Sequence, residues 1–219
     1  MSMQKSNAGP AKGCSCFQSG NLKWLTVLVV LLAMMFFDTK IVAIEDATYA
    51  NVFSPEAYGK KEFPRIQAEI EKRAVDAKML AEAIAADKTA AGEKYGKPGT
   101  VGPMFPIKFS GVVGEGESGV FHVKVDGLPE GIAVRVQTGP AINGTEVRDA
   151  TGTVDFGQFT NQIEYQDAGS ALNNEVKTQV LGDLDREKLP GKKVDIVGVF
   201  QLINPAGWLV TPVRLKVAP

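Results

Sequence analysis

The most prominent hydrophobic pattern is one uninterrupted apolar run near the N-terminus. Residues 24–37 read WLTVLVVLLAMMFF and carry no charge, whereas Asp38 and Lys40 precede a second apolar stretch at 41–44. A helix continued to residue 44 reaches a usable membrane-spanning length, because the Lys40 side chain can extend its ammonium to the interface. The pattern therefore predicts an uncleaved signal anchor over 24–44. The alternative is a cleaved signal peptide, whose apolar core has the length of 24–37.

Beyond residue 63 the apolar positions recur at spacings of three and four, which is typical of a helix with one buried face. They include Ile66, Ile70, Ala74, Ala77, Leu80 and Ile84. The spacing predicts one long helix from about 64 to 91 that ends at Gly92. Ser54 and Pro55 predict a short helical turn before it, with serine as the cap. Together these elements form an expected helical connector over 45–105.

A change of period follows the Gly/Pro-rich stretch 95–106. Apolar residues then alternate with polar ones, as in the strands of an antiparallel sheet. Strands are expected around 107–113, 121–125, 132–136, 154–156, 194–202 and 213–217, with a turn at 204–207. A second helix is expected over about 161–181, followed by Gly182.

These elements define an α+β fold class. The expected order is an N-terminal membrane anchor helix, an amphipathic helix, and a small antiparallel OB-like β-barrel with one inserted helix over 106–219. An OB barrel has five strands, so one of the six strand candidates is expected to be an addition or an error.

Charge assigns the two sides of the apolar run. Lys5, Lys12 and Lys23 are the only charged residues before it, and the rest of the chain carries an excess of acids. Positive charge stays in the cytoplasm, so the tail 1–23 is expected inside the cell and the domain in the periplasm. The whole chain has a net charge of −1, which argues against a nucleic-acid-binding protein.

The candidate binding residues lie between 139 and 166. Arg148 and Asp149 stand in a Gly-rich segment, where a guanidinium and a carboxylate can form the polar clamp of a carbohydrate site. The start of the second helix supplies further polar and aromatic groups. They are Asn161, Gln162, Glu164 and Tyr165. In the competing interpretation, Arg148 and Asp149 form a structural ion pair that pins the loop, and Asn161 and Glu164 form a capping pair.

Metal or cofactor chemistry is not expected from the sequence. His122 is the only histidine and lies on the polar face of its predicted strand. The segment 114–119 matches G-x-G-x-x-G, but a strand follows it where a phosphate site needs the start of a helix. The carboxylates of 183–187 lack the spacing of a calcium loop.

Several long blocks resemble one known family. They are KIVAIEDA (40–47), AVDAKMLAEAIAADKTAAGEKYG (74–96), GPAINGTEVRDATG (139–152), FTNQIEYQDAGSALNNEVKTQVL (159–181), LPGKKVDIVGVFQL (189–202) and LVTPVRLKV (209–217). These blocks resemble the DUF2291 family of predicted bacterial periplasmic lipoproteins, whose genes tend to lie beside sugar-type ABC transporter genes. Thr39 stands where lipidated members carry cysteine, and the two cysteines of the chain, Cys14 and Cys16, precede the apolar run. No lipid modification is therefore expected.

The resemblance implies a location rather than a mechanism. We expect a non-enzymatic accessory or scaffold module that is held in the inner membrane through 24–44 and associates with components of a sugar ABC transporter. The alternative is a small-molecule, carbohydrate-binding module that uses 139–166. A hydrolase that works with carboxylates alone is the third interpretation.

Overall fold

The computed structural model describes residues 19–38, 53–99 and 101–218. The segment from Phe53 to the C-terminus forms one compact unit, and α1 (Ser19–Asp38) belongs to a separate unit. The predicted anchor coincides with α1 up to residue 38, and its last part, 39–44, lies outside the described residues. Among the described residues, none of the helices has both the length and the apolar character needed to cross a membrane.

Three helices occupy the segment in which a single long helix is predicted over 64–91. They are α2 (Pro55–Arg73), α3 (Ala77–Ala86) and α4 (Lys88–Tyr95). The prediction of one helix is wrong because Asp76 and Asp87 each leave helical geometry and accept hydrogen bonds from the backbone N–H groups two and three residues ahead. An aspartate in this role starts a new helix. Ser54 caps the first helix as predicted, although that helix runs through Pro64 rather than ending as a short turn.

Five long strands form the sheet. They are β2 (Met104–Glu117), β3 (Val120–Val125), β4 (Ala133–Gln137), β5 (Lys193–Gln201) and β6 (Gly207–Val217). Hydrogen bonding follows the order β2-β3-β4-β6-β5, and β5 pairs back to β2. The β4–β6 pair is parallel, and the other four pairs of this ring are antiparallel. A two-residue strand β1 (Val75–Asp76) joins β2 in parallel. The α+β, OB-like fold class is confirmed.

The connection from β4 to β5 holds the inserted helix. It contains α5 (Glu146–Asp149), the short 3-10 helix η2 (Phe156–Gln158) and α6 (Gln162–Glu175), which continues as a π-helical turn η3 (Val176–Val180). The 3-10 helix η4 (Arg186–Lys188) precedes β5. The strand predicted at 154–156 is wrong: Val154 is buried, Phe156 is 49% exposed, and the backbone turns there. The candidate at 154–156 is therefore the surplus strand that was expected, since an OB barrel has five strands.

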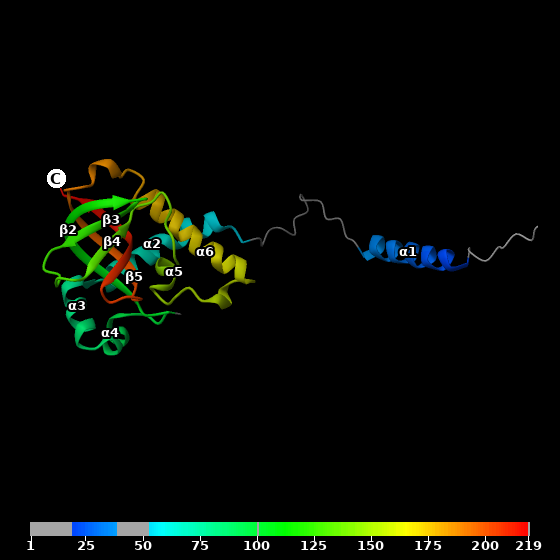
Figure 1. Ribbon diagram of the computed structural model, residues 1–219, viewed down its shortest axis with the longest axis horizontal. Helices are drawn as coiled ribbons and strands as arrows, with labels where there is room; N and C mark the ends of the chain where they lie inside the picture. Colours follow the sequence, from blue (N-terminus) through cyan, green and yellow to red (C-terminus); the bar gives the residue numbers. More distant parts are fainter. Residues whose placement is uncertain (1–18, 39–52, 100, 219) are drawn as a thin grey trace, which may run out of the picture. The chain divides into compact units, whose positions relative to one another are not determined.

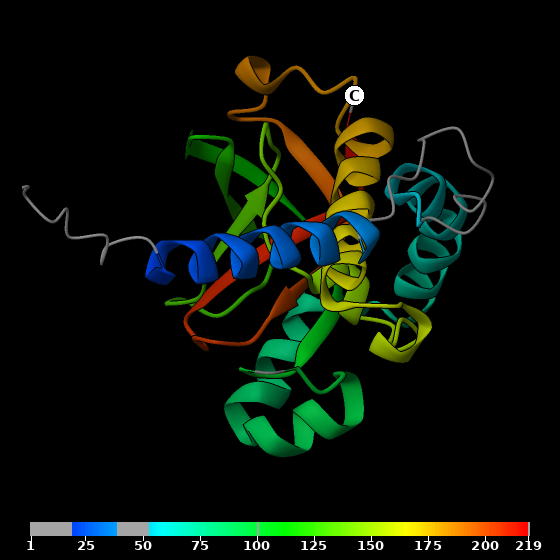
Figure 2. The same cartoon turned by 90° about the vertical axis from the view of Figure 1, so that its right-hand side faces the viewer.

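The hydrophobic core has two parts. One lies within the ring of strands and receives α3; in it the Phe200 ring stacks on Trp208 at 4.7 Å between centroids. The other lies between the outside of the ring and the helices α2 and α6. These two helices lie side by side on one flank of the strands, while α3 and α4 lie at another (Figures 1 and 2). The helices of 53–95, predicted as part of a connector, thus share both cores with the strands.

Candidate functional site

The predicted pair Arg148–Asp149 lies on the short helix α5, beside the first turns of α6. Arg148 is 7% exposed. Its Nε donates to Asp149 Oδ1 at 2.6 Å, and Nη2 donates to Oδ2 at 3.0 Å, which is the two-pronged geometry of a strong guanidinium–carboxylate pair. Its third nitrogen, Nη1, donates to the Tyr165 carbonyl oxygen at 2.9 Å. Every guanidinium nitrogen therefore has a partner within the domain.

Tyr165 covers this pair from α6. The guanidinium carbon of Arg148 lies 3.7 Å from the centroid of the Tyr165 ring, a close cation–π contact. The Tyr165 hydroxyl donates to Asp149 Oδ1 at 3.4 Å. Burial raises the pKa of the Tyr165 hydroxyl, and the negative charge of Asp149 acts in the same direction. The hydroxyl stays a hydrogen-bond donor at neutral pH, so it supports the carboxylate rather than competing with it.

The other candidates at the helix start have different surroundings. Asn161 Oδ1 accepts from the backbone N–H groups of Ile163 and Glu164, at 2.9 and 3.0 Å. Glu164 Oε2 in turn accepts from the Thr160 N–H at 2.9 Å. Both side chains thus cap the start of α6, as the competing interpretation described, although Glu164 accepts from the residue before Asn161 rather than from Asn161 itself. Gln162 is exposed. The structure thus brings Arg148, Asp149 and Tyr165 together and uses Asn161 and Glu164 at the helix terminus.

A hollow of about 290 Å³ lies beside Asp149 and Tyr165. Gly152 and Asp155 also border it, together with Pro98 and Gly99. Sequence reasoning missed these residues because they come from separate connections. The sequence held one signal for this hollow, the Gly/Pro-rich composition of 95–106. Glycine has no side chain, so such a segment lets a ligand approach the backbone closely.

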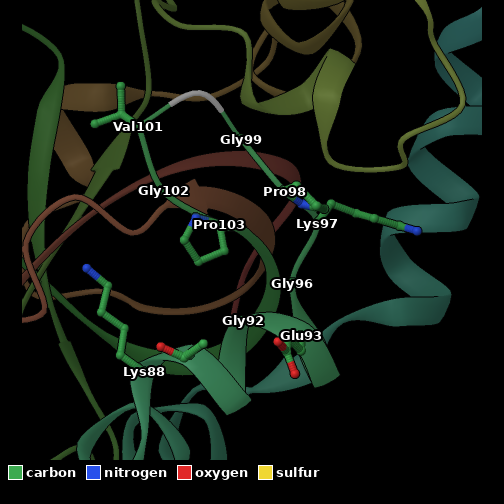
Figure 3. A pocket seen from close by; sticks show the side chains of 11 residues that line it. Lys88, Gly92, Glu93, Gly96, Lys97, Pro98, Gly99, Val101, Gly102 and Pro103 are labelled. Atoms are coloured by element: carbon green, nitrogen blue, oxygen red, sulfur yellow. The ribbon is translucent and has the colours of Figure 1, made fainter.

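A larger cleft, about 740 Å³, also has Pro98 and Gly99 in its lining. In Figure 3, Lys88 and Glu93 of α4 stand on one side, Val101 stands opposite, and Pro103 lies between them. Packing favours glycine at three of these positions, 96, 99 and 102. A Cβ on Gly99 would lie 2.5 Å from the carbonyl oxygen of Gly102. The cleft has the size of a ligand pocket, and it lies at the end of the stretch 45–105 that the sequence predicted as a connector.

A third hollow, about 580 Å³, lies at the β2–β3 hairpin. Its wall holds Glu115, Glu117, His122 and Arg135, and the last two face each other across the β3–β4 pair. His122 is exposed, as expected. Oligosaccharides and oligonucleotides commonly bind OB-folds on this face. Within the described ranges, no group of three His, Cys, Asp or Glu side chains has a geometry that could hold a metal ion.

The ring of strands and the inserted helix define an OB-like α+β protein. The chain belongs to the DUF2291 family, described as predicted periplasmic lipoprotein, whose model matches residues 26–216. Among solved structures, a crystal structure of an OB-fold protein from Thermotoga maritima MSB8 is similar. It shares 21% identity, has a TM-score of 0.62, and the match covers 76% of this chain and 99% of that chain. At this identity the likeness shows the fold. No curated protein matches the chain.

Proposed function

We propose that the protein is a non-enzymatic periplasmic accessory or scaffold module, held at the inner membrane through residues 24–44 and associated with a sugar-type ABC import system. The main observation in favour of membrane attachment is the exposure of the apolar side chains of α1. Its described side chains, 24–37, are all exposed, and Trp24, Phe36 and Phe37 are 76%, 80% and 86% exposed. Apolar surface of this extent is unfavourable in water, at about 25 cal/mol for each Å². A bilayer would cover it.

The orientation follows from charge. The three lysines that precede the run stay in the cytoplasm, and the compact unit 53–219 is then carried across. The family's description as periplasmic lipoproteins supports this orientation. The chain has no cysteine after residue 16, so attachment through α1 replaces attachment through a lipid.

Topology is tested with reporters fused after residue 219. We expect activity from a reporter that works only in the periplasm and none from one that works only in the cytoplasm; the reverse pattern refutes the orientation. Labelling with a radioactive fatty acid should leave the protein unmarked, and a marked band would show that the lipid assignment is wrong.

Association is tested by cross-linking in envelope membranes, followed by purification through a C-terminal tag. The matched control is the fragment 45–219 exported with a cleavable signal, which keeps the domain and loses the anchor. We expect importer subunits to be captured with the full chain and more weakly with the fragment. Capture of unrelated membrane proteins alone, in equal amounts, would contradict the accessory role.

The second candidate function is carbohydrate binding, and the hollow beside Asp149 favours it. The Asp149 and Asp155 carboxylates can accept hydrogen bonds from sugar hydroxyls, and Tyr165 borders the same hollow. Calorimetry of fragment 45–219 against a sugar panel tests this. Loss of one charge-assisted hydrogen bond commonly reduces affinity at least about tenfold, so Asp155→Asn should weaken binding by that factor. If Arg135→Ala abolishes binding instead, the ligand occupies the β2–β3 hairpin hollow. If calorimetry detects no heat of binding with any sugar, carbohydrate binding is refuted.

A further inference from the structure

We propose that the domain carries a membrane-contact surface at the end where residue 53 enters it, and that this surface rests on the phospholipid headgroups of the bilayer. We call it the aromatic surface. Its members are Phe53, Tyr58, Phe156, Phe159, Ile163 and Tyr165. The inference rests on the proposed attachment through 24–44 and adds a specific orientation of the domain.

The rings of this surface form a continuous cluster drawn from three elements. Phe53 contacts Tyr58 and Phe159, each with 5.5 Å between ring centroids. Phe159 contacts Tyr165 at 5.5 Å, and Tyr165 contacts Phe156 at 5.7 Å. The start of α2 and the start of α6 therefore lie together, on the same side of the domain in both views (Figures 1 and 2). The five rings therefore form one patch, although they come from segments about a hundred positions apart, and Ile163 extends it in the first turn of α6.

Two side chains of this region are left uncovered by the domain. Ile163 is 70% exposed and Phe156 is 49% exposed, whereas Phe53, Tyr58, Phe159 and Tyr165 are half-buried. Ile163 stands in the first turn of α6, whose N-terminal cap depends on backbone groups and the Asn161 side chain rather than on the isoleucine side chain. The two exposed side chains are therefore available for contact with an outside partner.

The short connection between the proposed anchor and the domain indicates that this partner is the bilayer. Residues 45–52 separate the end of the proposed anchor from Phe53. Eight residues span at most about 27 Å when fully extended, so the Phe53 end of the domain stays close to the membrane wherever the rest of it points. Aromatic side chains are favoured at the headgroup level, where an apolar ring meets partly hydrated surroundings.

The charges near the patch show no excess of positive charge, because Arg148 pairs with Asp149 and the first turn of α6 adds the carboxylate of Glu164. The contact therefore depends on apolar side chains. Glu56 pairs with Lys60 at 2.6 Å, and the exposed Asp155 and Lys61 contribute one charge of each sign. Electrostatic attraction to lipids would weaken as salt is added. The contact proposed here should instead be insensitive to salt.

The experiment uses the full chain in vesicles that contain brominated phospholipids, which quench tryptophan fluorescence at short range. Trp24 is first replaced by phenylalanine, so that the buried Trp208 is the remaining native tryptophan. One probe is then introduced, as Ile163→Trp. The matched control is Met79→Trp, at a 52% exposed position of α3 on the opposite side of the domain (Figure 1). Both changes affect exposed side chains, and a denaturant melt verifies that each variant folds.

We expect the Ile163→Trp variant to lose emission in brominated vesicles, at low and at high salt, while the Met79→Trp variant keeps it. Equal emission loss in the two variants, or none in either, overturns the aromatic surface. The unsubstituted chain reports on the anchor separately: quenching of Trp24 without quenching at position 163 removes the contact and leaves the attachment standing. If Trp24 is not quenched, the attachment fails and the aromatic surface fails with it.

Discussion

Replacing Arg148 by alanine distinguishes the structural interpretation of 139–166 from the binding interpretation. The guanidinium makes two hydrogen bonds to Asp149, a third to the Tyr165 carbonyl, and a cation–π contact with the Tyr165 ring. Truncation removes all four interactions at once. It also leaves the Asp149 carboxylate without its counter-charge and the carbonyl without its donor. The structural interpretation therefore predicts that Arg148→Ala unfolds more easily than the parent.

The size of the effect follows from burial. Removing one partner of a buried ion pair costs about 3–5 kcal/mol. The Arg148 side chain is 8% exposed and that of Asp149 is 22% exposed, so the abandoned carboxylate keeps part of its hydration. The expected loss lies at the lower end, about 3 kcal/mol. For a domain of this size such a loss lowers Tm by roughly 6–12 °C. Arg148→Lys keeps the charge but loses the two-pronged geometry, so its loss should be intermediate.

The assay is denaturant unfolding of fragment 45–219, followed by the fluorescence of Trp208. This residue is fully buried and is the only tryptophan in the fragment, so its emission reports on the core. Melting with and without candidate sugars completes the comparison. A loss below about 1 kcal/mol for Arg148→Ala, which is under the usual cost of stranding a buried hydrogen-bonding group, together with a sugar that raises the Tm of the parent but not of the variant, would refute the structural interpretation.

Three further predictions use the same fragment and the same melts. Phe200→Ala should cost about 3–5 kcal/mol, because the ring is fully buried against Trp208; a loss under about 1 kcal/mol would contradict its place in the core. Asn161→Ala should cost about 1 kcal/mol through loss of the helix cap, and Asn161→Asp, which keeps the accepting oxygen, should not. Burial raises the pKa of Glu146 above its ordinary value of 4.5, and the charge of Asp149 adds to the effect. The folded state then holds this proton more tightly than the unfolded state, so stability falls as pH rises from about 4.5 through the folded pKa. Glu146→Gln should remove that fall, and an unchanged pH profile would show that Glu146 is not its source.

The strands were predictable from the sequence because their signal is local. Ile107 and Phe109 alternate with solvent-facing positions, and the ladder places them on the buried face. The helices of 53–95 were less predictable. The apolar spacing of 66–84 continues across the breaks at Asp76 and Asp87, so the periodicity by itself describes one helix. A side-chain hydrogen bond to the backbone starts each new helix, and the short strand β1 forms because it pairs with β2. Such long-range pairing leaves no periodic signal.

In the candidate site, too, local contacts could be predicted from the sequence and long-range contacts could not. The capping roles of Asn161 and Glu164 follow from residues three positions apart and were visible as an alternative in the sequence. The contact of Arg148 with Tyr165 joins α5 to α6, and only the packing of those helices determines that the guanidinium lies on the ring. The hollow beside Asp149 is less predictable still, because residues 98–99 and 149–165, about fifty positions apart, border it together. A polar cluster in a sequence therefore identifies residues capable of binding, and the packing decides how many of their hydrogen bonds remain free.

The second core explains how residues so far apart come to share one surface. β5 is buried on both faces: Ile196 and Phe200 point into the ring, while Val197 and Val199 point toward α2 and α6. Gly59 brings these helices close, since a Cβ at this position would lie 3.0 Å from the Ala171 carbonyl oxygen. The two helices are thus held against the outside of the ring by core packing rather than by the rings at their ends. That packing holds the starts of α2 and α6 together before any contact with a membrane. Little binding free energy is therefore lost in ordering the aromatic surface. An apolar patch that is already organised can contact a membrane through the two exposed side chains, Phe156 and Ile163.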